Sequence, residues 1–292
     1  MIRILICFLL FNTVDLYAQS AERVESEYKL GIPNDEAGVL WKYLQSDGFL
    51  SKLRSEYDLI TEVSIEDFVD VYYDDEKSSL YKQKVGLRYR SRYIQDTLNK
   101  RIIQLKTPLL EDGVARTETK YEIKKSKDKN DIYARHKLLR YLKKKDRGNL
   151  NYQLAKFDSE SLKMKPAVML RQMRSRIYIT DSIASLATIT LDEVTNLKFP
   201  FQRYTEMELE LNEIRYTNSD EEGKKKMERF NEKLRNGLLV SFPSLYQDQT
   251  PKYNKMKQII DASWLSKLYK YRMWIILSFL VSIASYLLLF RK

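Results

Sequence analysis

The sequence predicts an α+β fold, in which helices pack outside an antiparallel β-sheet or barrel. Several segments alternate charged residues at a period of two, as strands do. Other segments carry apolar stripes at the spacing of a helix. The chain has 292 residues and a hydrophobic content of 43%, which is enough for one good-sized domain with signals at its ends.

The start of the chain has the pattern of a secretory signal peptide. Arg3 supplies a positive charge, residues 4–11 are apolar, and Ala18-Gln19-Ser20 offers small residues at a cleavage site. The apolar run is too short to span a bilayer. We therefore expect residues 1–20 to be a signal peptide, with a buried N-terminal strand or helix as the alternative.

Strands are predicted wherever charges alternate, because alternate side chains of a strand project to the same face. The charged sets, in chain order, are Glu25, Glu27 and Lys29; Arg88, Arg90 and Arg92; Arg116, Glu118, Lys120 and Glu122; Arg174 and Arg176; and Glu206, Glu208 and Glu210. The opposite face of the last strand, with Met207 and Leu209, is apolar.

Helices are predicted between these strands. The first covers residues 35–44, with Asn34 or Asp35 as its N-cap. A basic helix covers residues 131–145. The last covers residues 221–239, and its apolar side consists of Met227, Phe230, Leu234 and Leu238.

The end of the chain is a candidate transmembrane helix. Residues 273–290 carry no charge and, at about 1.5 Å per residue, just cover a hydrocarbon core of roughly 30 Å. With a cleaved signal, this helix would hold the domain outside the cytoplasm, in a periplasm or lumen. Lysine and arginine before the run outnumber those after it, contrary to the positive-inside rule. A tail-anchored cytoplasmic protein and a buried core helix are therefore the alternatives.

These signals divide the chain into four parts. They are a signal peptide (1–20), one folded domain (21–256), a juxtamembrane segment (257–272) and a transmembrane helix (273–290).

Composition excludes several kinds of site. The single cysteine, Cys7, lies in the first apolar run, so disulfides, cysteine zinc sites and a cysteine nucleophile are excluded from the domain. The single histidine, His136, argues against a Ser-His-Asp triad or a histidine-rich metal site. The formal net charge of +11 favours an acidic partner, which could be nucleic acid, anionic lipid or a small polyanion.

The alternating charges have two explanations. An amphipathic sheet with one face in water accounts for any single strand. Sets of like charge on several strands are costly unless something neutralises them, and a barrel that holds a metal and a phosphate chain would do so. Arg88 and Arg90 should repel each other unless an anion lies between them, so we expect their joint removal to leave the fold no less stable.

The order of motifs resembles the CYTH superfamily, also called triphosphate tunnel metalloenzymes. The matching motifs are Glu25-Ser26-Glu27-Tyr28-Lys29, Val71-Tyr72-Tyr73-Asp74, Leu87-Arg88-Tyr89-Arg90, Leu105-Lys106, Arg116-Thr117-Glu118, Leu191-Asp192-Glu193-Val194 and Glu206-Met207-Glu208. The resemblance spans roughly residues 23–255 and implies an eight-stranded antiparallel tunnel.

Three segments resemble the VTC-type polyphosphate polymerase branch more closely. They are residues 88–93, Phe199-Pro200-Phe201 and Pro251-Lys252-Tyr253, the last at the place where that branch has a helix lysine that closes one tunnel mouth. Two positions depart from the family pattern: Lys120 replaces an acidic residue, and Pro251 stands in place of a serine.

The resemblance implies a role for each charged set. Residues that would hold Mg²⁺ or Mn²⁺ are Glu25, Glu27, Glu118, Asp192, Glu206 and Glu208. Residues that would grip phosphate and act in catalysis are Lys29, Arg88, Arg90, Lys106, Arg174 and Arg176, and Arg116 and Lys252 would also bind the substrate.

The implied function is a membrane-anchored, metal-dependent protein that binds polyphosphate, tripolyphosphate or a nucleoside triphosphate. A polyphosphate polymerase is the first interpretation. A triphosphatase and a catalytically silent polyphosphate sensor are alternatives. A basic module for nucleic acid or lipid headgroups is a further class, but the three glutamates on one strand argue against a nucleic-acid face.

Overall fold

A computed structural model describes most of the folded domain. The described residues are 22–109, 115–123, 142–182, 184–264, 276, 278–283 and 285–286. The predicted signal peptide, half of the predicted transmembrane segment and most of the predicted helix over 131–145 lie outside them. In the part of the chain that the structure describes, no helix is long and apolar enough to cross a membrane.

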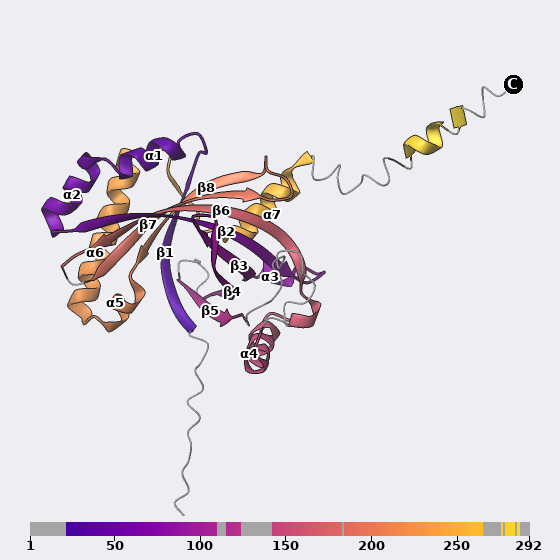
Figure 1. Cartoon of the computed structure of the whole chain (residues 1–292), viewed down its shortest axis with the longest axis horizontal. Coiled ribbons are helices and arrows are strands. Elements are labelled where there is room, and N and C mark those ends of the chain that lie inside the picture. The colour runs from indigo at the N-terminus through magenta and orange to yellow at the C-terminus, as the bar shows by residue number, and fades with distance from the viewer. Residues whose placement is uncertain are drawn as a thin grey trace, which may run out of the picture.

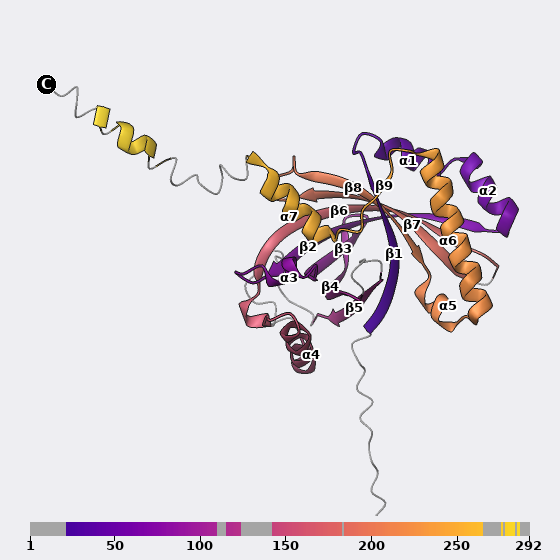
Figure 2. The ribbon, with the colours of Figure 1, turned by 180° about the vertical axis from the view of Figure 1, so that it is seen from behind.

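The centre of the fold is an antiparallel sheet of nine strands, in the order β5-β4-β3-β2-β6-β7-β8-β1-β9. Figure 1 labels the first eight strands and Figure 2 also labels β9. The strands are β1 (Glu22–Ile32), β2 (Ile60–Asp74), β3 (Gly86–Ile94), β4 (Thr97–Pro108), β5 (Ala115–Glu122), β6 (Lys165–Thr180), β7 (Ser185–Asn196), β8 (Arg203–Leu211) and β9 (Tyr246–Gln247). Every alternating charged set of the sequence lies on one of these strands, as predicted.

The sheet curls until its two ends meet along β1. Residues Glu22–Ser26 of β1 pair with β5, whereas Glu27–Ile32 pair with β8. The predicted eight-stranded tunnel is therefore only partly correct, because the sheet has nine strands and each half of β1 joins a different neighbour.

The ninth strand arises where the chain returns across the edge of β1. Tyr246 of β9 pairs with Gly31, and a Cβ at Gly31 would lie only 2.3 Å from the Tyr246 ring. Only glycine leaves room for this close approach. The same crossing brings the chain from the outside of the sheet to one end of its interior.

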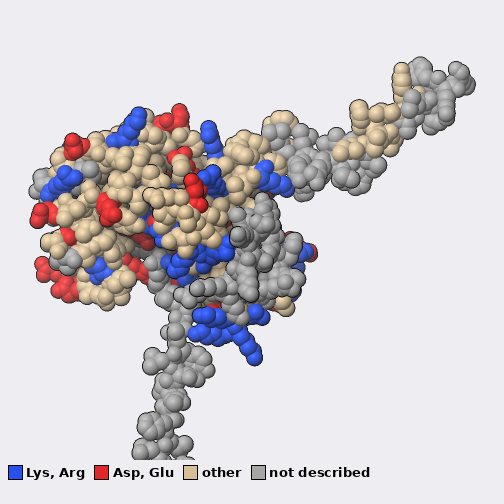
Figure 3. Space-filling model, in the orientation of Figure 1, with Lys and Arg blue, Asp and Glu red and all other residues tan. Residues whose placement is uncertain are grey.

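Seven α-helices of the described residues pack against this sheet. They are α1 (Ala37–Leu44), α2 (Asp47–Tyr57), α3 (Ser79–Lys82), α4 (Lys144–Ala155), α5 (Glu213–Asn218), α6 (Glu221–Ser241) and α7 (Lys252–Ala262). Helices α1 and α6 confirm the two predicted helices over residues 35–44 and 221–239. The predicted N-cap, Asn34 or Asp35, is wrong, because α1 begins at Ala37 and its N-cap is Glu36. The exposed residues Lys143, Lys144 and Lys145 begin the basic surface over α4 (Figure 3).

Two apolar layers cover the outside of the sheet. Helices α1, α2 and α6 cover β1, β6, β7 and β8 (Figure 2). Helix α6 contributes the predicted residues Met227, Phe230, Leu234 and Leu238. Leu80 of α3 and Leu150 of α4 pack with apolar side chains of β2 to β5. Because these outward side chains are apolar, the alternate charged side chains point into the interior.

The third apolar cluster closes one end of that interior. Tyr253 and Met256 of α7 pack against Tyr72, Val168 and Leu170 from β2 and β6. The Tyr72 and Tyr253 rings stack with a centroid distance of 5.4 Å. Helix α7 is thus held inside the end of the sheet, where its first residue, Lys252, reaches the charged interior.

Candidate anion and metal site

The interior of the curled sheet holds a cavity of about 290 Å³ with charged walls. Eleven lysine and arginine side chains and five glutamate side chains line it. Every predicted phosphate-binding residue is among them: Lys29, Arg88, Arg90, Lys106, Arg116, Arg174, Arg176 and Lys252. Members of every alternating charged set therefore line one cavity, rather than a flat face in water.

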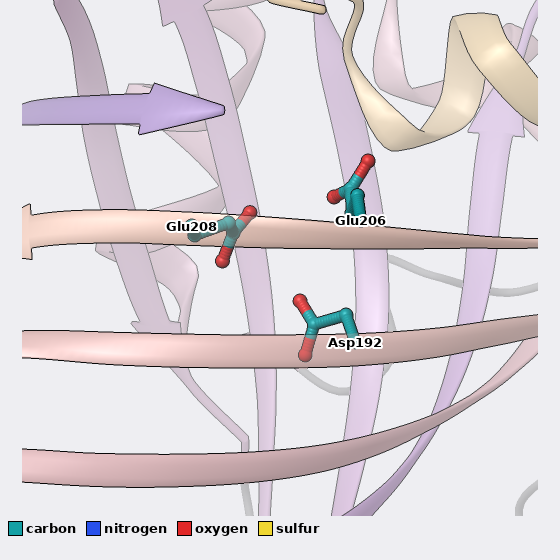
Figure 4. A group of neighbouring side chains, drawn as sticks. All are labelled: Asp192, Glu206 and Glu208. Carbon is teal, nitrogen blue, oxygen red and sulfur yellow. The ribbon is translucent and has the colours of Figure 1, made fainter. Parts of the chain in front are cut away.

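Lys252 places its ammonium among three buried carboxylates, which we call the acidic cluster: Asp192, Glu206 and Glu208. Its Nζ donates hydrogen bonds to Glu206 and, at 2.6 Å, to Glu208 Oε1, and lies 2.9 Å from Asp192 Oδ2. Oxygens of the three carboxylates lie within 4.8 Å of one another, and Figure 4 shows them gathered on β7 and β8. Lys252 therefore serves as the cation of this cluster.

Arg174 on β6 is a second cation of the acidic cluster. Its Nε and Nη2 donate to Asp192 at 2.8 and 2.6 Å, and Nη2 also donates to Glu208 at 2.6 Å. Burial alone would raise the pKa of Asp192 and of Glu208. The charges of Arg174 and Lys252 more than offset burial, so both pKa values lie below their usual range and both carboxylates are ionised.

Arg88 and Arg90 on β3 share one buried carboxylate. Asp70 on β2 accepts hydrogen bonds from Nε and Nη2 of Arg90 at 2.7 and 2.6 Å, and from Nη1 of Arg88 at 3.3 Å. Burial would raise the pKa of Asp70, but the two arginines hold it below its usual value. The anion between the arginines is therefore part of the protein. Their removal would leave Asp70 buried without them, which reverses the sequence-based expectation of an equally stable fold.

The remaining predicted residues lie around Lys29 and Lys106. The ammonium of Lys29 lies 3.2 Å from Glu27 and 3.4 Å from Glu208. The ammonium of Lys106 lies 4.0 Å from Glu27 and 3.9 Å from Glu118. Glu27 and Glu118, predicted as metal ligands, are therefore paired with lysines in this structure.

Arg116, Arg176 and Glu25 complete the predicted set. Arg116 is buried and donates to the Gln249 carbonyl at 3.2 Å. Arg176 contacts hydroxyl groups, with Nη1 donating to Tyr178 at 3.0 Å. Glu25 pairs with Arg116 in the register of β1 and β5, and its side chain lies outside the described part of the structure.

Sequence patterns did not identify Asp70 or the glutamines beside it. Gln172 accepts from Arg90 at 2.8 Å, and Gln104 accepts from Arg88 at 2.9 Å. The available signal was the alternation of Phe68, Asp70 and Tyr72 in the strand before the arginines. Pairing that strand with β3 as neighbours would have placed Asp70 beside Arg90.

Comparison with known families agrees with this geometry. The sequence model of the CYTH domain matches residues 40–238, which is more than half of the chain. The chain belongs to the CYTH domain family. No curated protein matches it. The narrower relation to the VTC branch is not established by this match.

Several solved structures are similar to this CYTH chain. A proposed adenylate cyclase from Bacillus halodurans is 16% identical, with a TM-score of 0.46 over 78% of this chain and 93% of its own. A Pyrococcus horikoshii protein is 19% identical, with a TM-score of 0.43 over 80% and 98%. A proposed adenylyl cyclase from Hippeastrum, described as having a dominant triphosphatase activity, is 19% identical, with a TM-score of 0.49 over 80% and 95%.

CYTH proteins are metal-dependent triphosphate tunnel enzymes, and the acidic cluster of this chain fits a divalent ion. It offers only carboxylate oxygens, the donors that Mg²⁺ and Mn²⁺ prefer. Buried Oε2 of Glu206 accepts no hydrogen bond from the described residues, and the Lys255 ammonium lies 3.7 Å from it. The Lys252 ammonium shows that the cluster can hold a cation, and a metal ion would have to take its place.

Proposed function

We propose that the cavity binds a linear triphosphate together with Mg²⁺ or Mn²⁺, and that the protein transfers a phosphoryl group from it. The observation that supports this most strongly is the cavity lined by eleven basic and five acidic side chains. Such an excess of positive charge favours a compact polyanion. Tripolyphosphate, a nucleoside triphosphate and the end of a polyphosphate chain all present the same three phosphates.

The basic residues that line the cavity and the acidic cluster, of which Glu208 lines the cavity, would have different roles. Arg88, Arg90 and Arg176 would donate to phosphate oxygens, because guanidinium forks match their geometry. Lys29, Lys106 and Arg116 would neutralise further charge. Asp192, Glu206 and Glu208 would hold the metal, which when bound polarises the phosphoryl group. Phosphoryl transfer needs mainly this positioning and charge neutralisation.

The acceptor decides the reaction. With water as acceptor the protein is a triphosphatase, and this agrees with its family. With a growing phosphate chain as acceptor it is a polyphosphate polymerase, the second candidate. A protein that binds and does not turn over is a sensor.

The test is incubation with ATP or tripolyphosphate and Mn²⁺ or Mg²⁺, with released phosphate and polymer measured together. We expect Arg176→Ala to lower turnover on the order of tenfold to a hundredfold, the worth of a charged hydrogen bond. Arg176 contacts no carboxylate in the described structure, so its loss should not lower the melting temperature.

The matched control is Arg171→Ala on the same strand, because Arg171 is exposed and pairs with Asp67 outside the cavity. This control should keep wild-type turnover. If the protein binds the triphosphate but neither phosphate release nor polymer is measured, the catalytically silent sensor is the remaining interpretation. Equal turnover by the wild type and Arg176→Ala would contradict the place of Arg176 in the site.

A further inference from the structure

Asp70 accepts hydrogen bonds from both Arg88 and Arg90 without itself lining the cavity. It lies in the middle of β2 with 0% of its surface exposed, and it is not among the residues that line the cavity. Arg88 and Arg90 do line the cavity. The carboxylate therefore holds the guanidinium groups from the side away from a ligand.

The hydrogen bonds around Asp70 fix which edges of the guanidiniums remain for a ligand. Arg90 uses Nε and Nη2 toward Asp70, and Nη2 also donates to Gln172. Arg88 uses Nε toward Gln104 and Nη1 toward Asp70 and Tyr72. Among the described residues, none accepts a hydrogen bond from Nη1 of Arg90 or Nη2 of Arg88.

The Phe68 ring and the Gln172 side chain also hold the Arg90 guanidinium in place. The Phe68 ring lies 4.2 Å from the centre of the Arg90 guanidinium, which therefore stacks on it. Gln172 is 1% exposed and, like Asp70, does not line the cavity. Each arginine is thus held by two or more groups, and little side-chain freedom is left to lose on binding.

We propose that Asp70, assisted by Gln172, is a positioning residue of the anion site: it holds Arg88 and Arg90 as a preformed pair of donors for neighbouring phosphates of one ligand. This inference rests on the proposed function of the cavity. The carboxylate also reduces the charge that the pair offers, so removing it acts in two opposite directions. Loss of geometry weakens binding, whereas loss of a negative charge strengthens the attraction for any anion. Because so many hydrogen bonds fix the two arginines, we expect the loss of geometry to outweigh the gain in electrostatic attraction.

The test is calorimetry of tripolyphosphate with Mg²⁺ on the full chain, well below the melting temperature of each variant. Asp70→Asn, which removes the charge at nearly constant shape, should weaken binding on the order of tenfold or more. Gln172→Met leaves the charge of the site unchanged and should weaken binding in the same direction, by roughly fivefold. The Gln172 variant also keeps the test open if Asp70→Asn does not fold.

A matched control lies on the same strand. Asp67 forms a bidentate pair with Arg171, at 2.9 and 2.6 Å, on the outer surface. Asp67→Asn should therefore leave binding within about twofold of the wild type, as expected for an exposed pair.

The outcomes separate this inference from the proposed function. Equal or tighter binding by Asp70→Asn overturns the positioning role and assigns Asp70 to charge balance. Wild-type affinity in Gln172→Met also overturns it. If the wild type itself does not bind tripolyphosphate, both the proposed function and this inference are overturned.

Discussion

Replacing Lys252 with methionine should destabilise the metal-free fold by about 3–5 kcal/mol, the usual effect of removing one partner from a buried ion pair. Methionine keeps much of the side-chain volume and removes the ammonium, so Asp192, Glu206 and Glu208 would keep only part of their neutralising charge. Added Mn²⁺ should restore most of the loss, because a dication can occupy the same carboxylates. Thermal melts with Mn²⁺ and with EDTA measure both effects.

The control for this variant lies on the same helix. Lys257 forms an exposed pair with Asp261 at 2.9 Å, and Lys257→Met should change stability by less than about 1 kcal/mol. If Lys252→Met melts like the wild type in EDTA and gains no more from Mn²⁺, then Lys252 does not neutralise the acidic cluster.

Changing Arg88 and Arg90 together to alanine should abolish tripolyphosphate binding and destabilise the fold by about 3–5 kcal/mol. The cause is Asp70, which is fully buried and would lose both of its arginine partners. Thermal melts with and without tripolyphosphate report the two effects separately, as the melting temperature and as its rise on adding the ligand.

A third substitution, Asp70→Asn, tests whether the loss of stability in this variant comes from the unpaired Asp70 carboxylate. Adding Asp70→Asn removes the uncompensated carboxylate, so it should recover part of the lost stability without recovering binding. A double alanine variant as stable as the wild type would contradict the pairing with Asp70. One that kept the full ligand-induced rise in melting temperature would show that these arginines do not hold the ligand.

The strands that carry the site could be predicted because their charges alternate. Residues two apart in a strand point to the same face, as Arg88 and Arg90 do, and so do Glu206 and Glu208. This spacing can be read from a short stretch of sequence. Helices α1 and α6 were predicted for a similar reason, from the helical spacing of their apolar residues. The ninth strand was not, because nothing in Tyr246–Gln247 itself signals pairing with Gly31.

The partners of the charged residues could not be predicted, because they depend on contacts between distant segments. Lys252 reaches carboxylates that are 44 and 46 residues away in sequence. Asp70 lies in a strand with polar and aromatic residues on both faces, so its alternation is weak. Lys252 was therefore predicted as a substrate ligand, whereas the structure shows it bound to the residues that would hold the metal.

The most direct test of the central claim is calorimetry of tripolyphosphate binding to the wild-type chain, with Mg²⁺ or Mn²⁺ and with excess EDTA. The proposed site predicts one saturable binding event that requires the cation, because Glu208 of the acidic cluster lines the same cavity as the basic side chains. Binding of equal strength in excess EDTA, or no binding with either cation, would contradict a metal-dependent triphosphate site.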